Sequence, residues 1–276
     1  MIISDDPSMI VANNFFATHN AEIDELVQKF RGYWSDIDRY KVIAWIQQFD
    51  RDHWELALKL LHKVDYYSPS RVIREFREIH AQLLVTLGRN LNNTYFCSLT
   101  PPGKSGDLML PLYRQASELR HNRYNAMFIH VSDLPQFHDQ SGIRFVFVDD
   151  FIGTGNTVIK YWENLQGFLT NAQEVCLLVL AAYEEGIEKI EQFSSLNIIT
   201  NRRLSVNEKI FSESCTLFTR EEKEILKHYC EISGNSWPEG YGECQSTIVF
   251  FHRAPNNTIS ILRCNTPSWK GLFPRY

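Results

Sequence analysis

The pattern of apolar and polar positions changes twice along the chain. Over residues 1–90, apolar residues recur at intervals of three and four, which predicts amphipathic helices. We expect three helices: residues 35–46, 52–63, and a stretch from Ser68-Pro69 to a terminating Gly88. Ser35 is the predicted N-cap of the first of these. Residues 1–90 therefore form a predicted helical N-terminal extension.

From about Thr94, short continuous apolar runs alternate with helical patterns. Five runs predict strands, at residues 95–99, 126–131, 143–148, 174–182 and 196–200. Helical patterns near 106–120, 155–170 and 184–193 fill most of the gaps between them. Continuous apolar strands separated by helices are typical of sheets buried on both faces. The pattern predicts an α/β core over residues 91–205, with a central parallel sheet flanked by helices.

The pattern changes again over residues 206–276. A helix is predicted near 220–231, followed by the apolar runs STIVFFHR and TISILR on either side of the turn sequence APNN. Two such runs joined by a short turn predict a β-hairpin. We therefore expect a C-terminal segment that carries a hairpin and adds to the α/β core.

Composition narrows the class of protein. The chain has 28 Lys+Arg against 33 Asp+Glu, a net charge of −5, so direct nucleic-acid binding is not indicated. Its longest apolar run, Val175 to Tyr183, is far shorter than the roughly 20 residues that span a bilayer. The N-terminus has no signal-peptide pattern, and the six cysteines include no C-x-x-C pair. We expect a cytoplasmic protein with no membrane partner and no structural zinc site.

The strongest chemical motif is FVFVDDFIGTGNTV, residues 145–158. An apolar strand is predicted to end in Asp149 and Asp150, and a helix to begin at Thr157. In an open parallel sheet, ligands bind at the carboxyl ends of strands. The small residues Gly153 to Thr157 suit an anion, because glycines allow close backbone approach and a helix N-terminus adds its dipole. Two carboxylates beside such a loop suit sugar hydroxyls or a divalent cation.

The segment VDDFIGTGNT resembles the PRPP-binding motif of the type I phosphoribosyltransferases. The resemblance implies that Asp149 and Asp150 contact the ribose 2′- and 3′-hydroxyls of PRPP. It also implies a 5′-phosphate loop formed by five residues: Gly153, Thr154, Gly155, Asn156 and Thr157. Many family members carry Thr where this chain has Gly153, so one hydroxyl donor is missing here.

A second segment, TPPGKSGDLMLPLYR, follows the first predicted core strand. Phosphoribosyltransferases carry a pyrophosphate-binding loop at this place. The resemblance implies that Gly103, Lys104, Ser105 and Gly106 form it. Lys104 would act as a point charge against the pyrophosphate oxygens.

A P-loop NTPase is an alternative, because Gly103-Lys104-Ser105 also ends a Walker A pattern and FVFVDD resembles a Walker B strand. Walker A, however, needs glycine where this chain has Ser98. Pro101 and Pro102 also remove two N–H donors from a loop that binds phosphate through N–H groups. A P-loop also leaves the TGNT segment after the acidic pair without a role.

The two ends of the chain add a further resemblance. WIQQF, LLHKVDYY, APNNTISI and SWKGLFPR are similar to segments of phosphoribosyltransferase-like proteins from bacterial conflict and antiphage loci. This implies that the flanks form a hood over the acceptor, and that a protein partner comes from the same defence locus. Trp269 and the Asn256-Asn257 turn are candidates for contacting a base or a partner.

Together these motifs predict transfer of a ribosyl phosphate from PRPP, or a related phosphoribosyl nucleotide, with pyrophosphate as the leaving group. Asp149, Asp150 and Lys104 are the candidate catalytic residues. Mg²⁺ is the expected cofactor, held by Asp149 and Asp150 through water or substrate hydroxyls. A non-catalytic PRPP or nucleotide sensor, or a partner-binding module, is the other class of function. No motif identifies the acceptor.

Overall fold

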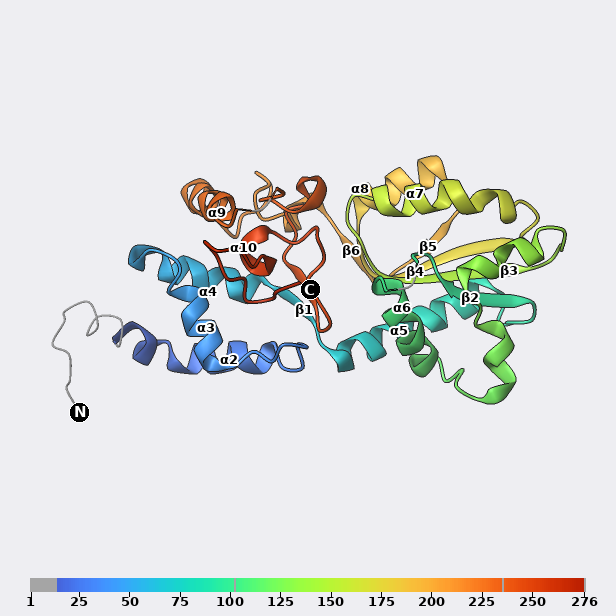
Figure 1. Ribbon diagram of the computed structural model, residues 1–276, viewed down its shortest axis with the longest axis horizontal. Coiled ribbons are helices and arrows are strands. Elements are labelled where there is room, and N and C mark those ends of the chain that lie inside the picture. Colours follow the sequence, from blue (N-terminus) through green and yellow to red (C-terminus); the bar gives the residue numbers. More distant parts are fainter. Residues whose placement is uncertain (1–13, 102, 235, 276) are drawn as a thin grey trace. The chain divides into compact units, whose positions relative to one another are not determined.

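The computed structural model in Figure 1 describes residues 14–101, 103–234 and 236–275. The chain divides into two compact units. Residues 69–215 form one, called here the sheet unit, and residues 1–68 with 216–276 form the other, called here the flanking unit. Within the described residues, none of the helices has the length and apolar character needed to cross a bilayer.

The sheet unit is an α/β structure, which confirms the predicted fold class. Its five strands are β2 (Thr94–Ser98), β3 (Arg144–Ile152), β4 (Glu174–Tyr183), β5 (Asn197–Ile199) and β6 (Arg202–Leu204). Every pairing is parallel, in the order β2-β3-β4-β5. β6 also pairs with β4, at Ala181 to Tyr183, farther along that strand than the residues that pair with β5. In this register Phe147 of β3 lies opposite Cys97 on one side and Leu177 on the other.

Helices cover both faces of this sheet. They are α5 (Pro69–Thr86), α6 (Ser105–Ala116), α7 (Asn156–Leu165) and α8 (Glu184–Phe193). Within the unit, α5 and α6 lie on one side of the strands and α7 and α8 on the other (Figure 1). Phe145 and Phe147 of β3 are buried in one cluster with Trp162 of α7 and Ile187 of α8. Removing this cluster from water is a main stabilising contribution on the face that α7 and α8 cover.

Most of the predicted strands are confirmed, but residues 126–131 are not a strand. They lie in two 3₁₀ segments, Asn122–Met127 and Val131–Phe137, with a single bridge from Phe96 to Phe128. His130 and Asp133 form a capping box, in which each side chain accepts from a backbone N–H. Such local side-chain bonds compete with a sheet ladder, and the apolar pattern alone does not reveal them.

The flanking unit brings the two ends of the chain together around a core of its own. Its elements are α2 (Asn20–Lys29), α3 (Arg39–Ile46), α4 (Trp54–Lys63), β1 (Asp65–Tyr67), α9 (Arg220–Ile232), β7 (Ile248–Phe250) and α10 (Ser260–Arg263). Strand β1 pairs in parallel with β7. Phe49 contacts Trp45, Tyr229 and Trp269 ring to ring. The flanks are thus a separate unit, with boundaries after Ser68 and Cys215, where we expected breaks at 90 and 205.

The predicted C-terminal hairpin is wrong. β7 has β1 as its strand partner, and the second run becomes the short helix α10. Two hydrogen bonds join the start of β7 to the residues just before α10. The Thr258 hydroxyl donates to the Ile248 carbonyl (2.7 Å), and Ile259 N–H donates to the Ser246 carbonyl (3.0 Å). All four residues of α10 are buried, and a short apolar run buried on every side fits a strand or a helix equally well.

The N-cap predicted for the first helix is also wrong. Asp38 caps α3, with its carboxylate accepting from Lys41 N–H at 2.8 Å, and Ser35 lies outside the helix. Asp and Ser are equally good N-caps, so the local sequence does not separate the two positions.

Candidate functional site

Strands β2, β3 and β4 run parallel side by side, so the segments that follow them share one edge of the sheet. The segment after β2 leads into α6, and the segment after β3 leads into α7. The Ser105 hydroxyl at the start of α6 donates to Asp149 Oδ1 in β3 at 2.7 Å. Residues 103–106 and 151–157 therefore lie at the same edge of the sheet.

The acidic pair lies inside β3, which continues past it to Ile152. Asp149 and Asp150 are each only 7% exposed. Asp149 Oδ1 also accepts from the backbone N–H of Asp150 at 2.9 Å. Burial is the main cause that raises the pKa of Asp149, and the neighbouring Asp150 charge adds to it, while the Ser105 hydrogen bond opposes both. A cation or a hydroxyl donor at this place would stabilise the ionised form.

This raised pKa makes the stability of the protein depend on pH. Because the folded state holds the Asp149 proton more tightly than the unfolded chain, its stabilising contribution falls as pH rises from about 4, the ordinary carboxyl value, through the raised pKa. We expect Asp149→Asn to reduce this fall and to unfold at higher urea than the parent at pH 8. Urea titrations at pH 5, 6.5 and 8 measure it. The control Asp139→Asn removes an exposed carboxylate and should keep the parental slope, and an Asp149→Asn slope equal to the parental one would contradict the assignment.

The loop from Gly153 to Gly155 is open for an anion. Gly155 adopts the left-handed conformation (φ 76°) as the N-cap of α7, and no side chain caps this helix end. The backbone N–H groups of Thr154 to Thr157 donate to none of the residues that the structure describes. Unpaired N–H groups at a helix start bind anions, and the helix dipole adds to the attraction.

Helix α8 packs directly against this loop. A Cβ on Gly186 would lie 2.2 Å from the Gly153 carbonyl oxygen, and one on Gly155 would lie 2.7 Å from the Gly186 carbonyl oxygen. These approaches leave no room for a side chain at either position. The first turns of α7 and α8 are therefore held in contact by two glycines.

Lys189, one turn beyond Gly186, is a site residue that the motifs do not identify. Its ammonium donates to Asn156 Oδ1 at 2.6 Å, which places a positive charge beside the open amides. The residue lies on the helix after the next strand, outside the VDDFIGTGNT motif. Only the parallel order β3-β4 brings it to the loop. The available signal was the predicted helix 184–193 directly after a core strand.

The second predicted loop also lies at this edge, but not all of its backbone N–H groups are available to a ligand. A Cβ on Gly106 would lie 2.1 Å from Ser98 Oγ, so the start of α6 packs tightly on the end of β2. Gly103 N–H donates to the Asp107 carboxylate at 2.6 Å. An anion that uses this amide has to displace Asp107. The exposed Lys104 ammonium has no hydrogen bond or ion pair with any described residue and is not joined to the acidic pair.

The predicted ligand contacts in the flanking unit are not supported. Trp269 is 2% exposed, and its indole N–H donates to the Ile261 carbonyl at 2.8 Å. Asn257 is buried, and its amide donates to the Tyr241 carbonyl at 3.0 Å. Trp269 is a core residue, which corrects its prediction as a base contact, and the Asn257 side chain fixes a turn.

A parallel sheet with an acidic pair and an open anion loop at the end of a central strand defines an α/β protein of the phosphoribosyltransferase type. The profile of the PRTase-CE family matches residues 42–275, and the chain belongs to this family. The match extends over both the sheet unit and the flanking unit. No curated protein sequence matches the chain.

Proposed function

We propose that the protein binds PRPP, or a related phosphoribosyl nucleotide, at the carboxyl edge of the sheet and transfers its ribosyl phosphate to an acceptor. The observation that carries this proposal is the Ser105–Asp149 hydrogen bond, which joins the start of α6 to the buried acidic pair in β3, the strand that leads into the anion loop. One substrate that carries phosphate, ribose and pyrophosphate would contact all three features. Membership of a phosphoribosyltransferase-type family supports the same chemistry.

Each part of the donor has a group to bind it. The 5′-phosphate would accept from the amides of Thr154 to Thr157, and the ribose hydroxyls would donate to Asp149 and Asp150. The pyrophosphate would lie near Lys104 and Ser105, and the Lys104 charge would stabilise the negative charge that develops as it leaves. Holding the sugar between these groups supplies most of what such a displacement needs from a protein.

Mg²⁺ fits this edge as an ion held mainly by substrate and water oxygens. Among the described residues, no group of three or more His, Cys, Asp or Glu side chains could hold a metal ion alone. Asp149 and Asp150 are a buried pair of hard oxygen donors, and burial raises the pKa of Asp149, so a nearby cation would stabilise its ionised form. When bound, Mg²⁺ would neutralise charge on the pyrophosphate.

The biological setting forms part of the proposal. The resemblance of the flanking segments to proteins of antiphage loci supports a role as a defence effector with a protein partner from the same locus. The P-loop alternative loses support, because the chain belongs to a phosphoribosyltransferase-type family and Gly103 N–H is already bonded to Asp107.

Titration of the purified full chain with PRPP, with and without Mg²⁺, tests binding by calorimetry. A parallel assay measures pyrophosphate release with a panel of purine and pyrimidine bases. We expect Mg²⁺-dependent 1:1 binding and release with at least one acceptor. Tight binding without release would favour the sensor function, and no binding of PRPP would contradict the proposal.

Loss of the Lys189 charge should weaken donor binding. The ammonium lies beside the amides that would hold the 5′-phosphate, and it is exposed, so we expect Lys189→Gln to raise the Kd for PRPP about fivefold at low salt. The difference should shrink at about 0.5 M salt, because screening reduces interactions between exposed charges. Lys160→Gln on α7, which removes an exposed ammonium, is the matched control. Equal affinities for both variants would show that Lys189 does not act on the phosphate.

A further inference from the structure

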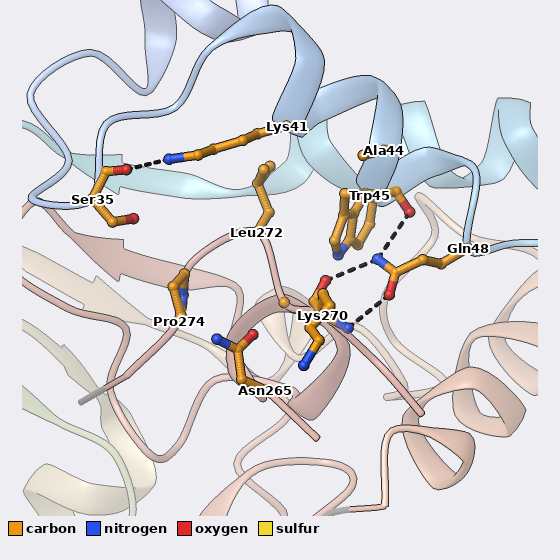
Figure 2. A pocket seen from close by; sticks show the side chains of 10 residues that line it. Ser35, Lys41, Ala44, Trp45, Gln48, Asn265, Lys270, Leu272 and Pro274 are labelled. Atoms are coloured by element: carbon orange, nitrogen blue, oxygen red, sulfur yellow. Dashed lines mark hydrogen bonds between the residues drawn. The ribbon is translucent and has the colours of Figure 1, made fainter. Parts of the chain in front are cut away.

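A cavity of about 420 Å³ lies within the flanking unit (Figure 2). One wall is α3 and the residues that precede it, and the other is the segment from Asn265 to Pro274. The volume lies within the range of small-molecule binding sites. Every described residue that lines it belongs to the flanking unit, so the cavity shares no described residue with the proposed sheet-edge site.

The walls of this cavity are held in place by hydrogen bonds. The Gln48 amide clamps the backbone of Lys270 from both directions: it donates to the Lys270 carbonyl at 2.8 Å and accepts from Lys270 N–H at 2.7 Å. The Trp45 indole donates to the Ile261 carbonyl at 2.9 Å. Gly271 N–H donates to the Cys264 carbonyl at 2.7 Å. A cavity whose walls are fixed in this way requires little ordering when a ligand binds.

The lining combines an apolar floor with a positively charged rim. Trp45, Leu272 and Pro274 are buried and form apolar surface. Lys41 and Lys270 are the charged residues among the described lining residues, none of which carries a carboxylate side chain. The Lys41 ammonium donates to the carbonyl oxygens of Ser35 and Asp36, which fixes it at the rim and leaves one of its three N–H groups for a ligand.

Lys270 is the more available of the two cations. Only its backbone is engaged by Gln48, and its ammonium makes no hydrogen bond or ion pair with any residue that the structure describes. In Figure 2 the side chain lies beside Asn265, whose amide supplies a further donor. Donors without an acidic partner above an apolar floor favour a ligand with an anionic head and an apolar body.

We propose that this cavity binds a small organic anion. Its carboxylate or phosphate head accepts from Lys270, with the Asn265 amide beside it, and its apolar body lies against Ala44 and Leu272. The two head groups share one recognition chemistry, so the experiment separates them. A neutral molecule of the same shape loses the charge-assisted hydrogen bonds, and an inorganic anion loses the apolar contact.

Calorimetry on the full chain uses two matched pairs without ribose: indole-3-acetate with indole-3-acetamide, and phenyl phosphate with phenol. We expect at least one anion to bind 1:1 with a Kd below about 1 mM, and its neutral counterpart at least fivefold more weakly. Lys270→Gln should raise that Kd about fivefold, whereas Lys63→Gln, in the same unit but outside the cavity, should leave it unchanged. The preferred pair identifies the head group.

Ala44→Phe offers a second arm, because Ala44 lines the cavity and a phenyl ring there occupies part of the space for the body. It should abolish binding while the circular dichroism spectrum stays parental. If this variant does not fold, comparing the anion's Kd in Lys270→Gln and Lys63→Gln still tests whether the anion binds in this cavity. Failure of both anions to bind, equal binding of the neutral partners, or an unchanged Kd in Lys270→Gln would each overturn the proposal. PRPP binding at the sheet edge is independent of all three outcomes.

Discussion

Asp149→Asn and Asp150→Asn should each weaken PRPP binding about tenfold to a hundredfold. Each substitution replaces a charged acceptor of ribose hydroxyls by a neutral amide of the same size. Charge-assisted hydrogen bonds of this kind contribute roughly 1.5–3 kcal/mol each. The pair is 7% exposed, so little water is present to replace the lost contact.

The fold should survive these substitutions. An asparagine at 149 keeps an oxygen that can accept from the Ser105 hydroxyl and from Asp150 N–H. We therefore expect changes in the free energy of unfolding within about 1 kcal/mol. PRPP affinity and melting temperature are measured on the same preparations, with Asp139→Asn as the exposed control. Parental affinity combined with a lowered melting temperature would make the pair a structural element and end its assignment to the donor.

Part of this site could be predicted from sequence because its signal is local. The run FVFV followed by two acids and a glycine-rich turn predicts a strand, a carboxylate pair and a helix start without any tertiary information. The predicted helix 184–193 has the bounds that α8 shows. Burial on both faces requires long apolar runs, and for this reason the strands predicted at 143–148 and 174–182 are confirmed as β3 and β4.

The remaining features depend on contacts between distant segments. TISILR has the composition of a strand, yet it is buried inside the flanking unit and contains the helix α10. The strand before it, β7, pairs with β1, which lies about 180 residues earlier in the sequence. Lys189 reaches Asn156 across two elements. The Gly103 N–H, which the loop sequence predicts to be available to a ligand, donates to the Asp107 carboxylate. No periodicity in the sequence encodes these three contacts.

The dependence of the phosphate loop on a second helix leads to the most demanding prediction, Gly186→Ala. The added methyl group would lie 2.2 Å from the Gly153 carbonyl oxygen and 2.8 Å from the Ile152 side chain, so α8 or the loop must move. Overpacking of this kind costs about 1–3 kcal/mol of folding free energy. If the loop is the part that moves, the amides of Thr154 to Thr157 are displaced with it, and PRPP affinity falls together with stability.

Gly167→Ala is the matched control, because a Cβ there meets nothing within 4 Å and the residue lies in a short 3₁₀ helix of the same unit. It should leave PRPP affinity unchanged and alter stability by less than about 1 kcal/mol. Denaturant unfolding and PRPP calorimetry on both variants separate the two effects. A stable Gly186→Ala protein with parental affinity would show that the loop binds without support from α8. A destabilised one with parental affinity would place the displacement in α8 itself and show that the loop keeps its phosphate-binding geometry when α8 shifts.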